Sequence, residues 1–155
     1  TTRASDSLSV TDASIFTSGE HSVYWEGSVN GSTLDPRLFE LNNENTTDRL
    51  RVDNNDGSKF RLNVRVANSD SVLSETTTAI PDNSKVVATV KTNEARLVLN
   101  GNTTVTDTST PISSGYSRLE IGSGHGGAGP LDGHVKRVAY YSTALTETQA
   151  QTLSN

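Results

Sequence analysis

The chain contains 155 residues with 13 basic and 18 acidic side chains, and it has no cysteine. This length suits one domain with a single core, and the lack of cysteine excludes a disulfide framework, a thiol nucleophile and a Cys-ligated zinc site. The formal charge of −5 and the absence of any basic block argue against nucleic acid or an anionic membrane as a partner.

The sequence shows neither a membrane-spanning segment nor a signal peptide. No apolar run reaches the roughly 20 residues that cross a bilayer, and residues 1–6 lack the apolar centre of a signal peptide. The chain also has no methionine, which indicates a mature product or a fragment. We expect a fragment, with residues 1–155 forming one domain of a longer polypeptide.

The composition and the residue pattern predict an all-β domain. Ser, Thr and Asn account for 54 residues, a bias typical of exposed β surfaces. In chain order the pattern predicts strands at Ser22–Val29, Arg37–Leu41, Arg49–Val52, Lys59–Val66, Ser84–Lys91, Ala95–Leu99, Thr103–Thr106, Arg118–Gly122 and Gly133–Tyr141. Short strands at this spacing indicate a sandwich or a barrel.

Alternation and turn chemistry support particular strand pairings. In Lys59–Val66 every second residue is apolar, as expected of a half-buried antiparallel strand. Asp53–Gly57 is predicted to join this strand to Arg49–Val52. Asn100-Gly101 suits a type I′ turn, which needs positive φ at both positions. Neighbouring strands are thus expected to pair as hairpins.

A single helix is predicted after the last strand, at Thr146–Leu153. Thr146 can cap its N-terminus, and Gln149 can reach back to complete a capping box. Leu145 and Leu153 can bracket the helix with apolar contacts. We therefore expect the helix to close one end of the fold, while the polar first dozen residues fray.

Several sequence blocks occur in an order that resembles one superfamily. The blocks are Val23–Glu26, Lys85–Val90, Leu97–Gly101, Leu119–Gly122 and Leu131–Thr146. Through them the chain resembles the laminin-G-like, concanavalin A-like lectin/glucanase jelly roll. The resemblance implies two antiparallel sheets packed as a jelly-roll β-sandwich with a short C-terminal helix. It also implies that a sugar is contacted on the concave face or by loops at one edge.

The C-terminal segment from Pro130 to Leu153 is most similar to lectin-like domains near the C-termini of bacteriophage tail and other virion proteins. This similarity implies an extracellular position on a virion surface, attached to the rest of a virion protein. A trimeric fibre is one arrangement of such a protein. The implied partner is a host surface polysaccharide or glycan.

A sugar site needs planar polar groups for the hydroxyls and an exposed aromatic ring for the pyranose face. Tyr24 and Trp25 are adjacent in one strand, so their side chains point to opposite faces. We assign Trp25 to the core because large aromatic side chains are usually buried, which leaves Tyr24 as a candidate sugar contact. Tyr116 is a second candidate because it lies beside a loop. Of Tyr140 and Tyr141, one is expected to pack and the other to face solvent.

The Gly-rich segment Gly122–Pro130 precedes a strand rather than a helix, which excludes a phosphate-binding loop. One interpretation is a ligand edge at which backbone amides, His125 and Asp132 meet sugar hydroxyls. The other is a plain connection between the sheets, with Asp132-Gly133 as a turn. The three histidines of the chain lack metal-ligand spacing and do not indicate a zinc site.

Asp53–Gly57 is the most calcium-like segment because oxygen-bearing side chains precede a glycine. The weak candidate ligands are Asp53, Asn55 and Asp56, but the distal Glu and the flanking helices of an EF-hand are missing. A plain hairpin turn is the favoured interpretation. We therefore expect no cofactor, with calcium as the one alternative.

The same jelly roll also carries glucanases, and a retaining hydrolase needs two carboxylates about 5 Å apart. No predicted strand supplies such a pair, since Glu26, Glu40 and Glu120 each stand alone on their strand face. No nucleophile-elbow motif is present either. We predict a non-catalytic carbohydrate-binding domain. The alternatives are a structural or oligomerisation module that binds no sugar and, less favoured, a polysaccharide-cleaving enzyme.

Overall fold

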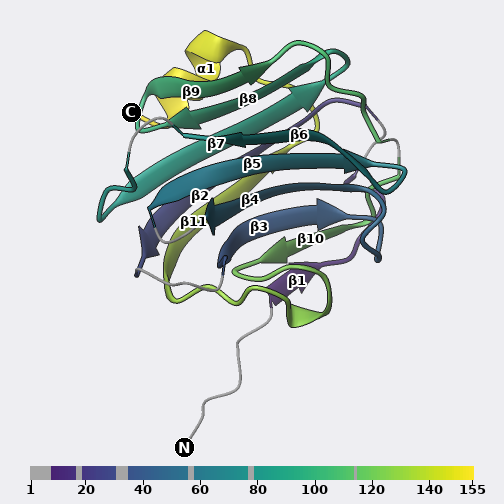
Figure 1. Cartoon of the computed structure of the whole chain (residues 1–155), viewed down its shortest axis with the longest axis horizontal. Coiled ribbons are helices and arrows are strands. Elements are labelled where there is room, and N and C mark those ends of the chain that lie inside the picture. The colour runs from purple at the N-terminus through teal and green to yellow at the C-terminus, as the bar shows by residue number, and fades with distance from the viewer. Residues whose placement is uncertain (1–7, 17–18, 31–34, 56–57, 77–78, 114) are drawn as a thin grey trace, which may run out of the picture.

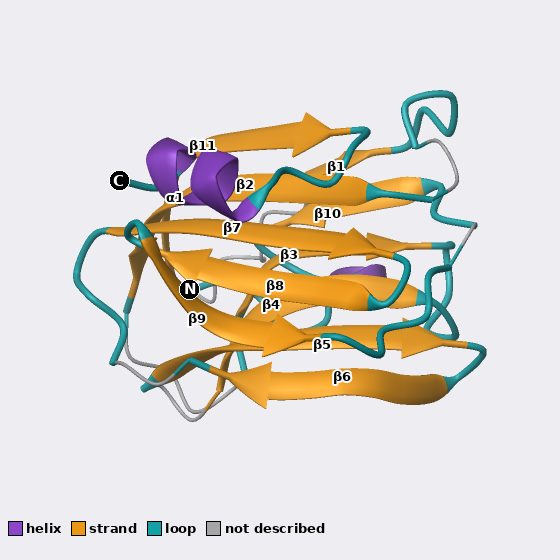
Figure 2. Cartoon of the chain, turned by 90° about the horizontal axis from the view of Figure 1, so that it is seen from above, coloured by secondary structure: helices purple, strands orange, loops and turns teal. Residues whose placement is uncertain are grey.

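The computed structural model describes residues 8–16, 19–30, 35–55, 58–76, 79–113 and 115–155. These residues form two antiparallel sheets that pack face to face (Figures 1 and 2). The six-stranded sheet contains, in spatial order, β1 (Leu8–Val10), β10 (Arg118–Ile121), β3 (Arg37–Asn42), β4 (Arg49–Asn55), β5 (Lys59–Val66) and β6 (Ser69–Glu75). The five-stranded sheet contains β11 (Gly133–Tyr141), β2 (His21–Val29), β7 (Ser84–Lys91), β8 (Glu94–Leu99) and β9 (Asn102–Asp107).

The predicted all-β jelly-roll sandwich with a short C-terminal helix is confirmed. Its core lies between the two sheets, because alternate residues of each strand point inward. In β5 the inward side chains Phe60 and Leu62 are fully buried. Trp25 of β2 is also fully buried, and its ring lies edge-on to Phe60 with 6.4 Å between the centroids. The assignment of Trp25 to the core is therefore confirmed.

The Asn100-Gly101 turn is confirmed, whereas Asp53–Asn55, predicted as part of a turn, belong to strand β4. Asn100 and Gly101 have φ of 47° and 76°, the double positive φ that a type I′ turn requires. Strands β4 and β5 pair along their length, and β4 continues to Asn55. The remainder of the predicted turn, Asp56 and Gly57, lies outside the described residues.

The helix α1 (Glu147–Leu153) begins as predicted. Thr146 accepts a hydrogen bond from the backbone of Gln149, and the Gln149 side chain accepts from the backbone of Thr146, which completes the capping box. The helix lies on the outer face of the five-stranded sheet (Figure 2). Its buried residue Ala150 joins a hydrophobic cluster with Tyr24 of β2, Val87 of β7 and Val98 of β8.

Two strands differ from the sequence prediction, and both are edges of the six-stranded sheet. Leu8–Val10, within the segment expected to fray, forms β1 and pairs with β10. Ser69–Glu75 forms β6 and pairs with β5. Neither segment was expected as a strand. Between β10 and β11 the Gly-rich loop contains one short 3-10 turn, η1 (His125–Gly127).

No helix in the described part of the chain is long and apolar enough to cross a membrane.

Candidate functional site

The outward side of the six-stranded sheet carries charged and amide side chains almost exclusively. In β3, Phe39 and Leu41 point into the core, so Glu40 and Asn42 point outward. The same alternation in the neighbouring strands completes a surface that we call the arginine face. Its members are Arg37, Glu40, Asn42, Arg49, Arg51, Asp53, Arg61, Asn63, Arg65, Asp70, Arg118 and Glu120.

The strand register arranges these side chains in rows across the sheet. One row runs through Arg65, Arg49, Asn42 and Arg118, and the next runs through Asn63, Arg51, Glu40 and Glu120. Six of the nine arginines in the sequence belong to the arginine face. Figure 1 shows β3, β4 and β5 side by side, which brings these rows together.

Asp53 is a fully buried anion on this face, and two arginines share its carboxylate. Arg51 Nε lies 2.6 Å from Asp53 Oδ2, and Arg61 Nε lies 2.9 Å from Asp53 Oδ1. Burial raises the pKa of Asp53 above its usual range, and the two guanidinium groups oppose this rise. Arg61 also lies 3.7 Å from the exposed carboxylate of Asp35.

Asp70, at the β5–β6 side of the face, is the second carboxylate shared by two arginines. Arg65 donates to both of its oxygens at 2.8 Å, a bidentate pair that holds the Asp70 pKa well below its usual range. Arg49 Nη2 lies 3.7 Å from Asp70, and Arg49 Nε donates to Asn63 Oδ1 at 2.8 Å. Burial, together with the positive charges of Arg51 and Arg65, lowers the pKa of Arg49 to about 10.

Glu40 anchors the Gly-rich loop to the arginine face. Its fully buried carboxylate accepts hydrogen bonds from Arg37 Nη1 at 3.0 Å, Asn42 Nδ2 at 3.2 Å and the backbone N–H of His125 at 3.1 Å. At Gly124 an added Cβ would lie 1.7 Å from Arg37 Nη1, so a larger residue here would force the Arg37 side chain to move. The loop is thus fixed along one side of the face.

Glu40 and Glu120 are direct cross-strand neighbours, an arrangement that the sequence analysis did not predict. The spacing of carboxylates along the sequence predicts pairs within one strand, whereas Glu40 and Glu120 come from different strands. They become neighbours through the register of β10 with β3. Arg118 Nε lies 2.9 Å from Glu120 Oε1. Because arginines and other donors already engage both carboxylates, the pair forms part of a structural ion network.

The structure places the two predicted tyrosine contacts away from the arginine face. Tyr24 points out of the five-stranded sheet, as expected, but it lies in a hydrophobic cluster with Ala150 of α1, and only 3% of it is exposed. Its hydroxyl donates to Glu26 Oε2 at 3.0 Å, and burial is the main cause that raises its pKa to about 12. Tyr116 lies beside a loop in the sequence, yet its ring packs inside the sandwich 5.3 Å from His21. Tyr116 is therefore not exposed beside a loop, as the sequence analysis had expected, but buried in the core.

The other predicted contacts occupy separate places. His125 is half-buried in the loop that Glu40 anchors, so it borders the arginine face. Asp132 is exposed just before β11, where its carboxylate accepts a hydrogen bond from Asn30 Nδ2 at 3.0 Å. Tyr140 packs against Phe16, with 5.1 Å between the ring centroids. The four predicted sugar contacts therefore do not form one site.

The calcium candidates contact cations of the protein itself. Asp53 lies between two arginines, and Asn55 Oδ1 accepts a hydrogen bond from Arg61 Nη1 at 2.7 Å. The Asn55 amide contacts Glu75, and Asp56 is not among the described residues. In the described ranges no three His, Asp or Glu side chains gather in a group that could hold a metal ion.

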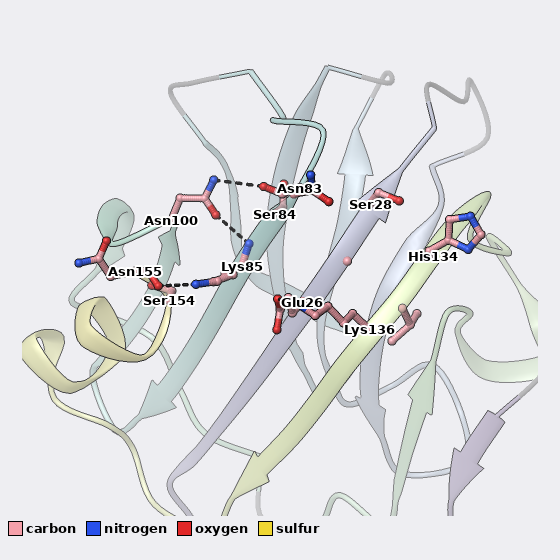
Figure 3. A pocket seen from close by; sticks show the side chains of 12 residues that line it. Glu26, Ser28, Asn83, Ser84, Lys85, Asn100, His134, Lys136, Ser154 and Asn155 are labelled. Carbon is pink, nitrogen blue, oxygen red and sulfur yellow. Dashed lines mark hydrogen bonds and ion pairs between the residues drawn. The ribbon is translucent and has the colours of Figure 1, made fainter.

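A groove lies on the opposite side of the molecule, on the outer face of the five-stranded sheet (Figure 3). This groove has a volume of about 510 Å³, and its lining includes Glu26, Lys85 and Lys136. Lys136 Nζ lies 2.6 Å from Glu26 Oε1, and the Lys85 ammonium contacts the backbone carbonyl of Asn155. We call it the Lys85–Lys136 groove. Its charged side chains mainly contact the protein itself.

The two antiparallel sheets and their order define a lectin-type jelly roll. Residues 2–151 match the family model described as the concanavalin A-like lectin/glucanases superfamily, and the chain belongs to this superfamily. A search of curated proteins finds no match.

Three solved structures illustrate the similarity of fold. The CBM40 domain of Ruminococcus gnavus IT-sialidase, bound to α2,3-sialyllactose, has a TM-score of 0.76 and 12% identity over 92% of this chain and 86% of that chain. Domain 4 of the AbnA arabinanase of Geobacillus stearothermophilus, in complex with arabinotriose, has a TM-score of 0.72 and 16% identity over 93% and 70%. The NanB sialidase of Streptococcus pneumoniae has a TM-score of 0.73 and 14% identity over 96% and 27%. At these identities the similarity shows the fold alone.

Proposed function

We propose that this domain binds carbohydrate without cleaving it and that the arginine face holds the sugar. The observation that carries the proposal is the continuous layer of guanidinium, amide and carboxylate groups across β10, β3, β4 and β5. Sugar hydroxyls both donate and accept hydrogen bonds, and planar side chains of this kind pair with them in fixed directions.

The layer is already ordered before a ligand arrives. Arg51 and Arg61 are held by Asp53, and Arg49 is held by Asn63, with side chains that are mostly buried against one another. Ordering such side chains on binding costs little further entropy, which favours affinity. Two of the fold relatives are described in complex with a sugar, sialyllactose or arabinotriose, which supports the same class of ligand here.

Hydrogen bonding, rather than stacking on an aromatic ring, would dominate recognition. None of the aromatic side chains in the described ranges is fully exposed; Tyr140 and Tyr141 are half-buried and the others are buried. The sugar would therefore lie on the guanidinium groups, since the amides of Asn42 and Asn63 are fully buried. A domain of this kind typically binds weakly as a single copy, and several copies on one particle raise the avidity.

The binding is proposed to be non-catalytic because the paired carboxylates are engaged. A general acid or a nucleophile needs a carboxylate oxygen that can reach the substrate. Glu40 accepts three hydrogen bonds from the protein and is fully buried, and Glu120 lies against Arg118. Neither is placed to exchange a proton with a bound sugar.

The biological setting that we propose is a virion surface, where the domain, attached to a longer virion protein in a trimeric fibre, recognises host glycans. The similarity of the C-terminal segment, Pro130–Leu153, to virion lectin-like domains supports this setting. We also propose that sugar binding needs no calcium, because the oxygens of Asp53 and Asn55 face arginines.

A glycan and bacterial-polysaccharide array tests the proposal, with the domain multimerised on a scaffold and assayed with calcium and with chelator. We expect saturable binding that chelator leaves unchanged. Arg51→Ala should weaken it, whereas Lys136→Ala, in the Lys85–Lys136 groove, should not. If a folded domain bound no glycan on the array, the result would instead support a structural module. If only Lys136→Ala lost binding, the sugar would bind in the Lys85–Lys136 groove and not on the arginine face.

A further inference from the structure

We infer that the sugar bound by the arginine face carries a carboxylate and that Arg49 and Arg51 hold this group. The inference rests on the proposed function, since it names the class of sugar for the same site. It depends on the local balance of charge, on the hydrogen-bond donors that the protein leaves unused and on the groups that surround them.

Positive charge exceeds negative charge where β4 meets β5. Four arginines, Arg49, Arg51, Arg61 and Arg65, point outward from these two strands. Within the arginine face they share only two carboxylates, Asp53 and Asp70. Two further anions lie nearby: Asp35, which is 52% exposed and lies 3.7 Å from Arg61, and Glu40, the cross-strand neighbour of Arg51, whose carboxylate forms its ion pair with Arg37. The pair formed by Arg49 and Arg51 therefore lacks a full counter-charge.

The same two arginines keep donors that no described residue uses. Among the described residues, the Arg51 side chain has one ion-pair or hydrogen-bond partner, Asp53, which lies against its Nε. Arg49 uses Nε for Asn63, and its nearest anion, Asp70, is 3.7 Å away. A guanidinium carries five N–H donors, and its planar fork matches the two oxygens of a carboxylate. Arg49 and Arg51 can thus each offer further N–H groups to an anion.

The surroundings favour one carboxylate within a sugar over a densely charged polymer. Glu40 and Glu120 continue the row of Arg51 across β3 and β10, where Arg37 and Arg118 balance their charges, so the uncompensated positive charge ends at β4. The chain as a whole has a charge of −5. A polyanion such as nucleic acid or a heavily sulfated chain would extend beyond this region over a surface that offers no further net positive charge. A saccharide with one carboxylate and several hydroxyls fits both parts of the face.

A paired saccharide panel tests the inference on the intact domain. The acidic probes are saccharides with a single carboxylate, the methyl glycosides of galacturonate, glucuronate, mannuronate and N-acetylneuraminate, each beside its carboxyl-reduced neutral form, with dextran sulfate as the polyanion control. We expect at least one acidic probe to bind about tenfold or more tightly than its reduced form, because charge-assisted hydrogen bonds are lost on reduction. The preference should decline as salt increases.

The outcomes separate this inference from the proposed function. Equal binding of an acidic probe and its reduced form, or binding of neutral glycans alone, would overturn the carboxylate assignment and leave sugar binding standing. Dextran sulfate binding as tightly as the best acidic probe would also overturn it. If a folded domain binds nothing on this panel or on the wider glycan array, the proposed function itself fails.

Variants of Arg51 locate the carboxylate. Arg51→Gln should weaken binding of the acidic probe about 10- to 100-fold while weakening its neutral form much less. Arg51→Lys keeps the charge but not the fork and should recover only part of the loss. Arg137→Gln, on the other sheet, is the matched control and should change neither. Thermal melting of each variant verifies folding, and an equal loss for both probes would contradict the assignment.

Discussion

Asp53 is the buried anion that two arginines share, so replacing it with asparagine tests whether the arginine face is a fixed ion network. Asp53→Asn keeps the size of the side chain and removes its charge. Arg51 and Arg61 then lose the carboxylate that lies 2.6 Å and 2.9 Å from their Nε atoms. Removing one partner of a fully buried ion pair costs about 3–5 kcal/mol.

The expected cost is somewhat smaller here. The side chains of Arg51 and Arg61 keep 11% and 15% exposure, and Asp35 remains near Arg61. We therefore expect a loss of about 2–4 kcal/mol in the free energy of unfolding, since partial solvation reduces the penalty. For a domain of this size that loss lowers the melting temperature by roughly 4–16 °C.

Urea and thermal unfolding at pH 7 measure the effect of Asp53→Asn. The urea midpoint should fall without a change in the slope, because the folded state stays equally compact. Asp82→Asn removes an exposed carboxylate from a turn and is the matched control, with an expected change of at most about 0.5 kcal/mol. If Asp53→Asn cost less than about 1 kcal/mol, the two guanidiniums would be well solvated, and the fixed network would be refuted.

Three further changes test other parts of the fold. Gly27→Ala places a Cβ 2.0 Å from the His134 carbonyl oxygen and should cost about 1–3 kcal/mol in urea unfolding, whereas Gly115→Ala meets nothing closer than 3.9 Å and should be nearly neutral. Burial lowers the pKa of His21, so the folded state favours the neutral imidazole. The free energy of unfolding therefore has its full value above pH 6.5, the pKa of histidine in the unfolded chain, and it declines as the pH falls from there toward the lower pKa of the folded state. Urea midpoints at pH 7.5 and 5.5 should show this decline, and His21→Gln should reduce it; an unchanged pH dependence would contradict the burial argument. Thr146→Ala removes the helix cap and should cost about 1 kcal/mol, and a variant as stable as the parent would show that the capping box contributes nothing.

The central strands were predictable because their residues alternate in a way that only a half-buried strand explains. Lys59–Val66 is the clearest case, and it forms β5 with these bounds. The edge strands β1 and β6 lack this signal. In Ser69–Glu75 most residues are polar, as is common where one edge of a sheet meets water. Their strand state depends on pairing with a neighbour, which local composition does not reveal.

The arginine face was not predictable from local motifs. Arg49, Arg51, Arg61 and Arg65 belong to two strands, and Glu40 belongs to a third. They become neighbours only through the register of β3, β4 and β5. A sequence signal does exist, since outward positions of consecutive predicted strands carry arginine or carboxylate. Using that signal requires the strand order, which the spacing of turns does not fix.

The exposure of the two candidate tyrosines was not predictable either, because it also depends on tertiary contacts. Tyr116 follows Gly115 and precedes a strand, so its neighbours in sequence suggested a loop surface. The chain turns its ring inward, where it lies beside His21 and gains burial. Tyr24 faces outward as expected, but it is buried in a cluster that includes Ala150 of the C-terminal helix, which is distant in sequence. In both cases a tertiary contact decided the exposure.

The most direct test of the account maps the sugar onto the folded domain. Backbone amide shifts would be followed by NMR while the tightest array ligand is added to the labelled domain. Binding at the arginine face should give the largest changes in β3, β4, β5 and the loop around His125, with little change near Lys136. Changes confined to the Lys85–Lys136 groove, with β4 and β5 unmoved, would show that the arginine face is not the binding site.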